Sequence, residues 1–206
     1  MPNYRRLFRG GASKIPTVSA AIDSVRHSIQ ERKELLVLYF NFDRYTKIEE
    51  IYGWEKLDEV LHTTSNAIRE FVSSSPFSYS EVMVNFTNDD DFVLFHIPSP
   101  NTAVPNDDVI TEFTAKLHQF LAGRIEEEHG EDIASLFDTF VGSAHIHYDP
   151  KIRLERQIYR AIRNAASSSN SVEQREFGLK AADLRETLRT GGLYIHYHPI
   201  VVTETQ

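Results

Sequence analysis

Residues 82–97, V-M-V-N-F-T-N-D-D-D-F-V-L-F-H-I, limit the possible folds of this chain more than any other stretch. Two runs rich in β-branched and aromatic residues flank a short polar cluster at residues 87–91. Valine, phenylalanine and isoleucine suit a pleated, half-buried surface, whereas asparagine and aspartate tolerate the backbone conformations of a tight reversal. The stretch therefore predicts a β-hairpin with three successive carboxylates, Asp89, Asp90 and Asp91, at its tip. Such a tip is most often a hydrated turn, and only the rest of the sequence can indicate whether its carboxylates have a binding or catalytic role.

The periodicity of the apolar residues predicts further elements around this hairpin. Residues 35–43 form an almost unbroken apolar run, which is typical of a strand covered on both faces. Residues 140–148 alternate as a second strand, and a last strand is predicted at 193–202. Helical spacing predicts helices at about 17–29, 44–52, 57–72, 110–125, 152–166 and 173–189, with residues 167–171 as a polar, linker-like break. A hairpin within this mixed order predicts an α+β fold, a sheet with helices packed on it.

Composition excludes several classes of function. The net charge is −8 and no long lysine or arginine block is present, so nucleic acid is not an expected partner. No cysteine is present, which excludes disulfides and thiolate chemistry. The longest apolar run, residues 35–40, is too short to cross a bilayer, and the N-terminus lacks the apolar segment of a signal peptide. We expect a cytoplasmic segment without membrane contact, which could still be part of a larger membrane protein.

Two blocks of the sequence together resemble the GGDEF family of diguanylate cyclases, which condense two GTP into cyclic di-GMP. Residues 41–58, N-F-D-R-Y-T-K-I-E-E-I-Y-G-W-E-K-L-D, follow the register of the family's first strand and the helices after it. Residues 142–150 resemble its later S-I-G-x-A strand, and residues 158–161 resemble the L-Y-x-A of its last helix. The family's signature hairpin falls on Asn88, Asp89, Asp90, Asp91 and Phe92. The resemblance implies a nucleotide-cyclase-like, mostly antiparallel central sheet in a domain at 17–171, preceded by a loose segment at 1–16.

The tail carries a second resemblance. Residues 184–201 are similar to the opening helix and strand of an EAL domain, the cyclic di-GMP phosphodiesterase module, with His198 where glutamine is common. The metal-binding carboxylates of that module are absent from this chain. Residues 172–206 are therefore expected to be a linker helix and the start of a truncated EAL domain, without phosphodiesterase activity of their own.

The GGDEF resemblance implies a metal site of which only part is present. The residues expected to hold magnesium are Asn41, which offers a neutral amide instead of a carboxylate, and Asp90, with Asp91 as a weaker candidate ligand. The two signature glycines are replaced by Asn88 and Asp89. Asp89 places a negative charge beside incoming phosphates, a repulsion of several kcal/mol at roughly 4–6 Å in partly screened surroundings.

The nucleotide-binding positions that the resemblance implies are also incomplete. Asp58 matches the base-reading aspartate, but Glu49 stands where asparagine is expected, and a carboxylate cannot donate a hydrogen bond to the guanine carbonyl. The phosphate-binding lysine is Ile162, and the arginine after it is Ala166 or a neighbouring serine. The R-x-x-D product-inhibition site would fall on Tyr79 and Val82, neither of which matches.

The sequence thus predicts a degenerate GGDEF-like domain that is not an enzyme and regulates an adjoining EAL module or pairs with a second copy. No cofactor is expected, and magnesium only if a nucleotide is bound. Two alternatives stay open: a domain that binds GTP or another nucleotide without turnover, and a residual diguanylate cyclase. His145 and His147 have a spacing that can chelate a metal, but a surface pair is the simpler interpretation. The basic face of residues 153–163 could bind an anion or an acidic partner, or simply balance the acidic remainder.

Overall fold

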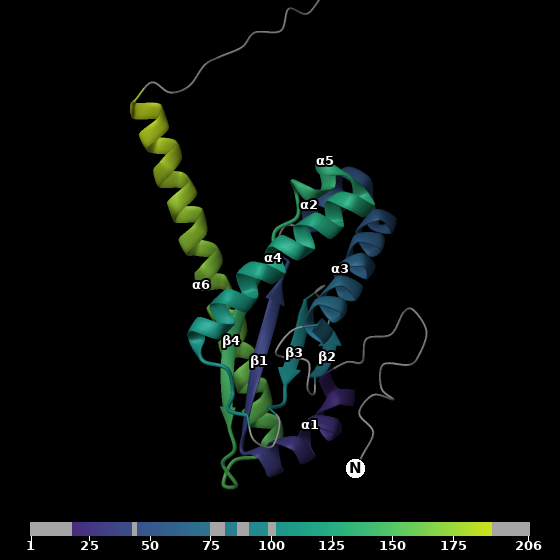
Figure 1. Cartoon of the computed structure of the whole chain (residues 1–206), viewed down its shortest axis with the longest axis vertical. Helices are drawn as coiled ribbons and strands as arrows, with labels where there is room; N and C mark the ends of the chain where they lie inside the picture. Colours follow the sequence, from purple (N-terminus) through teal and green to yellow (C-terminus); the bar gives the residue numbers. More distant parts are fainter. Residues whose placement is uncertain (1–17, 43–44, 75–80, 86–90, 99–101, 191–206) are drawn as a thin grey trace, which may run out of the picture. The chain divides into compact units, whose positions relative to one another are not determined.

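The strand that the sequence predicts to be covered on both faces is the centre of the structure. In the computed structural model, β1 (Glu34–Asn41) lies between β3 (Phe92–His96) and β4 (Phe140–His147), and β2 (Glu81–Asn85) borders β3 (Figure 1). Each neighbouring pair of strands is antiparallel. The sheet and the helices around it confirm the predicted α+β class, and β2 with β3 confirms the two strands of the hairpin.

The structure describes residues 18–42, 45–74, 81–85, 91–98 and 102–190. The predicted N-terminal segment, most of the hairpin tip and the last predicted strand lie outside these ranges. The chain divides into two compact units, Met1–Val172 and Glu173–Gln206. Within the described residues, no helix is both long enough and apolar enough to cross a membrane.

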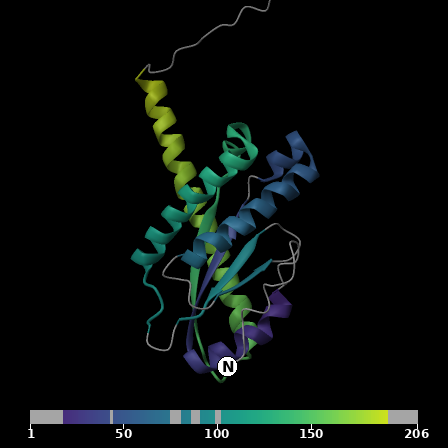
Figure 2. The same cartoon turned by 45° about the vertical axis from the view of Figure 1, so that its right-hand side comes forward.

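Helices cover both faces of the sheet in the first unit. They are α1 (Val18–Arg32), α2 (Tyr45–Tyr52), α3 (Trp54–Ser74), α4 (Asp107–His129), α5 (Glu131–Ala134) and α6 (Leu154–Arg189). One face of the sheet is covered by α2, α3, α4 and α5, and the other by α1 and the first turns of α6 (Figure 2). Leu36, Leu38 and Phe40 of β1 belong to the core cluster of the first group, and Leu35, Val37 and Tyr39 belong to that of the second. Residues 35–40 of β1 are all buried. The predicted coverage of this strand on both faces is confirmed.

Local sequence signals explain where several helices begin and end. Gly53, with φ +88°, separates α2 from α3, between the helices predicted at 44–52 and 57–72, in a backbone region that residues with a side chain rarely adopt. The side chain of Asn106 accepts a hydrogen bond of 3.0 Å from the backbone N–H of Val109 and so caps the N-terminus of α4. The short helix α5 was not predicted, because a single turn is too short for a helical period to show.

The predicted break at residues 167–171 is wrong, because α6 runs through it without interruption. Two of its serine hydroxyls donate hydrogen bonds to backbone carbonyls of the same helix. Ser169 donates to Ala166 at 2.8 Å, and Ser171 donates to Ser167 at 2.9 Å. Such back-bonding makes serine tolerable inside a helix despite its preference for caps and turns. Buried Ser169 also belongs to the part of α6 that packs on β4.

The second unit is described over residues 173–190 only, almost all of which belong to the C-terminal part of α6. Large apolar side chains are exposed along this segment: Phe177, Leu179, Leu184 and Leu188. The predicted EAL-like strand lies outside the described residues, and its assignment stays a prediction.

Candidate functional site

The structure brings together the two blocks of sequence on which the expected nucleotide site depends. Phe40 at the end of β1 pairs with Phe92 at the start of β3, so the segment after β1 runs beside the C-terminal part of the signature. The rings of Phe42 and Phe92 meet edge to face with centroids 5.5 Å apart. Asn88, Asp89 and Asp90 lie outside the described residues, and their predicted roles stay predictions.

Asp91 is held by two donors from the β1 side of this junction. Its carboxylate accepts a hydrogen bond from the hydroxyl of Tyr39 and a long one, 3.4 Å, from the backbone N–H of Phe42. Tyr39 lies almost buried in β1, with its ring in the layer of α1 and α6. The contact joins β1 to β3 at the root of the hairpin. Sequence reasoning missed Tyr39, whose only signal was a hydroxyl within an otherwise apolar strand.

Asn41, the expected metal position at the end of β1, contacts another element of the same chain. Its side-chain amide donates a hydrogen bond of 3.1 Å to the side-chain oxygen of Asn170 in α6. This contact orients the Asn41 amide with its nitrogen toward α6. Because the amide oxygen is neutral, it is a weaker magnesium ligand than the carboxylate that the resemblance implies.

The two expected base-reading residues lie on the corner formed by α2 and α3. Fully buried Ile48 anchors α2 in the core, while Glu49 and Asp58 are exposed. Neither carboxylate forms a hydrogen bond or ion pair with another described residue. The structure thus leaves both side chains accessible. Of the three carboxylates at the hairpin tip, the structure describes that of Asp91.

The position expected to hold a phosphate-binding lysine is part of the core. Ile162 is fully buried and belongs to the same core cluster as Ile158 of α6 and Val25 of α1. Ala166, one turn later, is partly buried against the same cluster. The arginines nearest to Ile162 in α6, Arg160 and Arg163, are exposed instead.

The described residues do not fit a divalent metal. Of the side chains expected near magnesium, the structure describes the neutral amide of Asn41 and the engaged carboxylate of Asp91. His145 and His147 stack with ring centroids 6.1 Å apart, and the Nδ1 atom of each lies 3.5 Å from the same Glu34 oxygen. Across the part of the chain that the structure describes, no group of three or more His, Cys, Asp or Glu residues could hold a metal ion.

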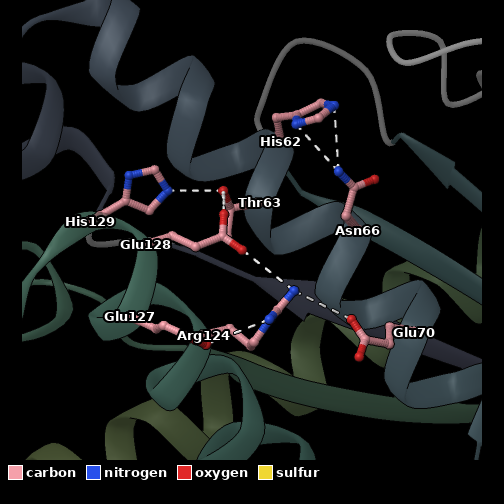
Figure 3. A network of polar contacts seen from close by, with 8 residues as sticks. All are labelled: His62, Thr63, Asn66, Glu70, Arg124, Glu127, Glu128 and His129. Carbon is pink, nitrogen blue, oxygen red and sulfur yellow. Dashed lines mark hydrogen bonds and ion pairs between the residues drawn. The ribbon is translucent and has the colours of Figure 1, made fainter.

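A polar network between α3 and α4 was not predicted (Figure 3). The buried hydroxyl of Thr63 donates to Glu128 at 2.9 Å and lies 2.9 Å from Nε2 of His129. Because a hydroxyl has one hydrogen, Thr63 must accept from the Nε2–H of His129. Burial is the main reason that the pKa of His129 is lowered; Lys56 lowers it further, and Glu128 and Glu59 oppose the shift.

Arg124 extends this network along α4 and across to α3. Its guanidinium lies 3.5 Å from Glu70, 3.5 Å from Glu127 and 3.4 Å from Glu128. These distances are long and the partners are exposed, so each pair contributes about 0–1 kcal/mol. The network joins two helices and lies on their polar surface, and we assign it a structural role.

Comparison with solved structures identifies the fold. No protein-family model and no curated protein matches the sequence. The GGDEF domain of DgcB from Caulobacter crescentus, in complex with c-di-GMP, is similar with a TM-score of 0.56 at 12% identity, covering 79% of this chain and 90% of that one. The active GGEEF domain of a diguanylate cyclase from Vibrio cholerae gives a TM-score of 0.56 at 13% identity, covering 79% and 93%.

The FimX GGDEF domain from Pseudomonas aeruginosa is also similar, with a TM-score of 0.53 at 15% identity, and the match covers 79% of this chain and 96% of that one. Identities this low establish the fold and carry no residue's role from one chain to the other. The chain has the fold of GGDEF domains.

Proposed function

We propose that this chain is a GGDEF-like domain of a cyclic di-GMP signalling protein that no longer makes the dinucleotide and acts as a regulatory or interaction domain. An adjoining EAL module, suggested by the resemblance of residues 184–201, is the proposed target of its regulation. The fold and the two sequence resemblances support the signalling context, and the engaged side chains at the root of the hairpin support the loss of catalysis.

The observation that carries the proposal is the state of Asp91. Its carboxylate accepts hydrogen bonds from the Tyr39 hydroxyl and the Phe42 backbone N–H. A carboxylate that ligates magnesium must direct its oxygens at the ion. To do so, Asp91 would have to give up partners inside a folded junction, and this cost favours a structural role.

Two further contacts support the same conclusion. Phosphoryl transfer from GTP depends on metal ions and positive groups around the phosphates rather than on covalent help from the protein. Asn41 turns its amide nitrogen toward Asn170, and Ile162 is buried among apolar side chains. Neither position supplies the charge that the reaction needs.

Titration calorimetry of the whole chain with GTP, in magnesium and in manganese, tests the proposal together with a sensitive assay for cyclic di-GMP. We expect no turnover under conditions in which an active GGDEF domain, used as the control, forms product. Stoichiometric formation of cyclic di-GMP by this chain would overturn the proposal.

One observation favours a second candidate, a domain that binds a nucleotide without turnover. Glu49 and Asp58, the expected base-reading residues, are both exposed on the corner of α2 and α3. The same titration separates the candidates. Binding without product identifies a nucleotide sensor, whereas neither binding nor product identifies an interaction domain.

A further inference from the structure

The corner between α2 and α3 exposes a group of apolar side chains with free carboxylates around them. Trp54, the single tryptophan of the chain, is 63% exposed, and Ile51 and Tyr52 beside it are exposed as well. Water-exposed apolar side chains gathered in this way, with polar residues around them, are typical of protein interaction sites. The exposed acidic residues of this corner are Glu49, Glu50, Glu55 and Asp58. We call this surface the acidic corner.

None of these four carboxylates forms a hydrogen bond or ion pair with another described residue. The nearby Glu59 differs, because Lys56 binds it at 2.9 Å and lowers the pKa of its carboxyl group. The acidic corner therefore combines uncompensated negative charge with exposed apolar area.

The first turns of α6 carry a surface of the opposite charge. Arg153, Arg156, Arg160 and Arg163 are exposed, and none of their guanidinium groups forms a hydrogen bond or ion pair with another described residue. Arg153 directly precedes α6, and spacings of four and three positions keep Arg156, Arg160 and Arg163 within about 60° of arc on one helix face, over roughly 10 Å of its length. Tyr159 is partly exposed beside them. We call this surface the arginine ridge.

The two surfaces belong to opposite sides of the sheet. The acidic corner is anchored by Ile48 and Leu57 in the core cluster of α2 to α5, whereas the arginine ridge is anchored by Ile158 in the cluster of α1 and α6. The sheet separates them, so they do not meet within one chain (Figure 2). Every copy carries both surfaces, so each surface can contact the oppositely charged surface of a second copy.

We infer that the acidic corner of one copy binds the arginine ridge of another. Arginine pairs with carboxylates through its planar fork of donors and also stacks on the faces of tryptophan and tyrosine. The corner supplies both kinds of partner within residues 49–58. Because the contact joins two different surfaces, it leads to a ring or an open chain of copies rather than a closed two-fold dimer.

A second copy fits the ridge better than other anionic partners do. The net charge of −8 repels nucleic acid, anionic membranes and a second copy alike at long range, so local complementarity has to distinguish among these partners. The corner of a second copy offers four carboxylates together with apolar side chains, and those side chains are then removed from water.

Trp54 reports directly on the contact, because it is the only tryptophan and lies within the acidic corner. We expect sedimentation of the whole 206-residue chain to show association that rises with concentration and weakens in salt. The emission of Trp54 should shift to shorter wavelength over the same concentration range. A constant monomer with unchanged emission would overturn the inference.

Charge reversal tests the two surfaces separately. Arg156→Glu with Arg160→Glu on the ridge, or Glu50→Lys with Glu55→Lys on the corner, should each weaken association about tenfold or more. An equimolar mixture of the two variants should associate again, because each retains one intact wild-type surface and those surfaces are complementary. Glu49 and Asp58 stay unchanged, so a loss of association is not confused with a change at the predicted base-reading positions.

Asp108→Lys with Glu126→Lys on α4 is the matched control, with the same change of charge on exposed carboxylates that likewise form no ion pair with a described residue, and should associate like the wild type. Association that survives both reversals would place the contact on another surface and overturn the inference. So would binding of the ridge to anionic vesicles or nucleic acid in place of a second copy. The GTP titration and this experiment fail independently, because neither the corner pair nor the ridge pair includes a residue on which the loss of catalysis is argued.

Discussion

Residue 142 lies where β4 and α6 come too close for any side chain. A Cβ at Gly142 would lie 1.9 Å from the Ala165 carbonyl oxygen and 2.4 Å from the Ser169 amide nitrogen. Both are backbone atoms inside a helix, so neither can move aside without shifting α6. We expect Gly142→Ala to lower the free energy of unfolding by about 2–3 kcal/mol or more, as overpacking does.

Urea denaturation measures this effect, and Gly123→Ala in α4 is its control. At Gly123 an added Cβ meets nothing within 4 Å, and alanine is the better helix former. This substitution should raise the free energy of unfolding by about 0.5–1 kcal/mol. Similar effects at the two glycines would contradict the close packing of β4 on α6.

His129 makes the stability of the network between α3 and α4 depend on pH. Its Nε2–H is donated to Thr63, and its Nδ1 atom is buried without a partner among the described residues. The folded state lowers the pKa of His129, so below its ordinary value of 6.5 the unfolded chain binds the proton more readily. Its contribution to stability is therefore complete above pH 6.5 and is lost as pH falls toward the folded pKa.

Denaturation curves between pH 7.5 and about 5 test this, with each variant compared to the wild type. In His129→Gln the amide can still donate to Thr63 but does not titrate, so the loss of stability on acidification should be smaller. Lys56, Glu59 and Glu128 face His129 and remain in both proteins. His118→Gln, at an exposed position of α4, is the control. An unchanged pH dependence in His129→Gln would refute the assignment.

At the scale of elements, the hydrogen bond between Tyr39 and Asp91 joins β1 to β3 at the root of the hairpin. Tyr39→Phe keeps the ring in its layer and removes the donor to a charged acceptor. We expect the free energy of unfolding to fall by about 1.5–3 kcal/mol. Chemical denaturation measures it, and a double-mutant cycle with Asp91→Asn gives the coupling between the two side chains.

Tyr148→Phe is the matched control for Tyr39→Phe. The hydroxyl of Tyr148 makes no hydrogen bond to another described residue, while Lys33 lies 4.7 Å from the centre of its ring and retains that contact in the variant. Stability should change little. No coupling between residues 39 and 91 would show that Asp91 does not hold the junction.

The helix α6 shows how packing overrides a local signal. Serine-rich residues 167–171 have the composition of a linker, yet the helix passes through them. Ser169 is fully buried, and its backbone approaches Gly142 of the neighbouring strand. Packing of this kind makes helix favourable where composition alone favours a break.

For the whole molecule, the pairing of Phe40 with Phe92 brings the end of β1 beside the start of β3, and a reversal tests the weak GTP binding that the sequence predicts there. Asp89→Gly with Glu49→Asn removes a charge from the phosphate side and restores a donor to the base side. We expect GTP affinity, measured by calorimetry with magnesium, to rise about tenfold or more.

Glu112→Gln with Glu126→Gln removes the same charge from α4 and controls for the net charge of the chain. It should leave the affinity for GTP as it is in the wild type. An unchanged affinity for GTP in the Asp89→Gly, Glu49→Asn variant would show that neither the charge of Asp89 nor the missing donor at Glu49 weakens GTP binding.

The sequence by itself determined the class of fold and most of its elements. Apolar residues on both sides of β1, the alternation in β4 and the break at Gly53 are local patterns, and a local pattern is enough to fix the type of an element. The order and spacing of the two GGDEF-like blocks also predicted the fold that the solved structures share.

Only the tertiary structure decided what individual polar side chains do. The partner of Asp91 lies 52 positions away in the chain, and that of Asn41 lies 129 positions away. Contacts between such distant residues depend on how strands and helices are packed, and no spacing in the sequence records them. The same reason explains why the network of Thr63 and His129, the close approach at Gly142 and the uninterrupted helix α6 became visible only in three dimensions.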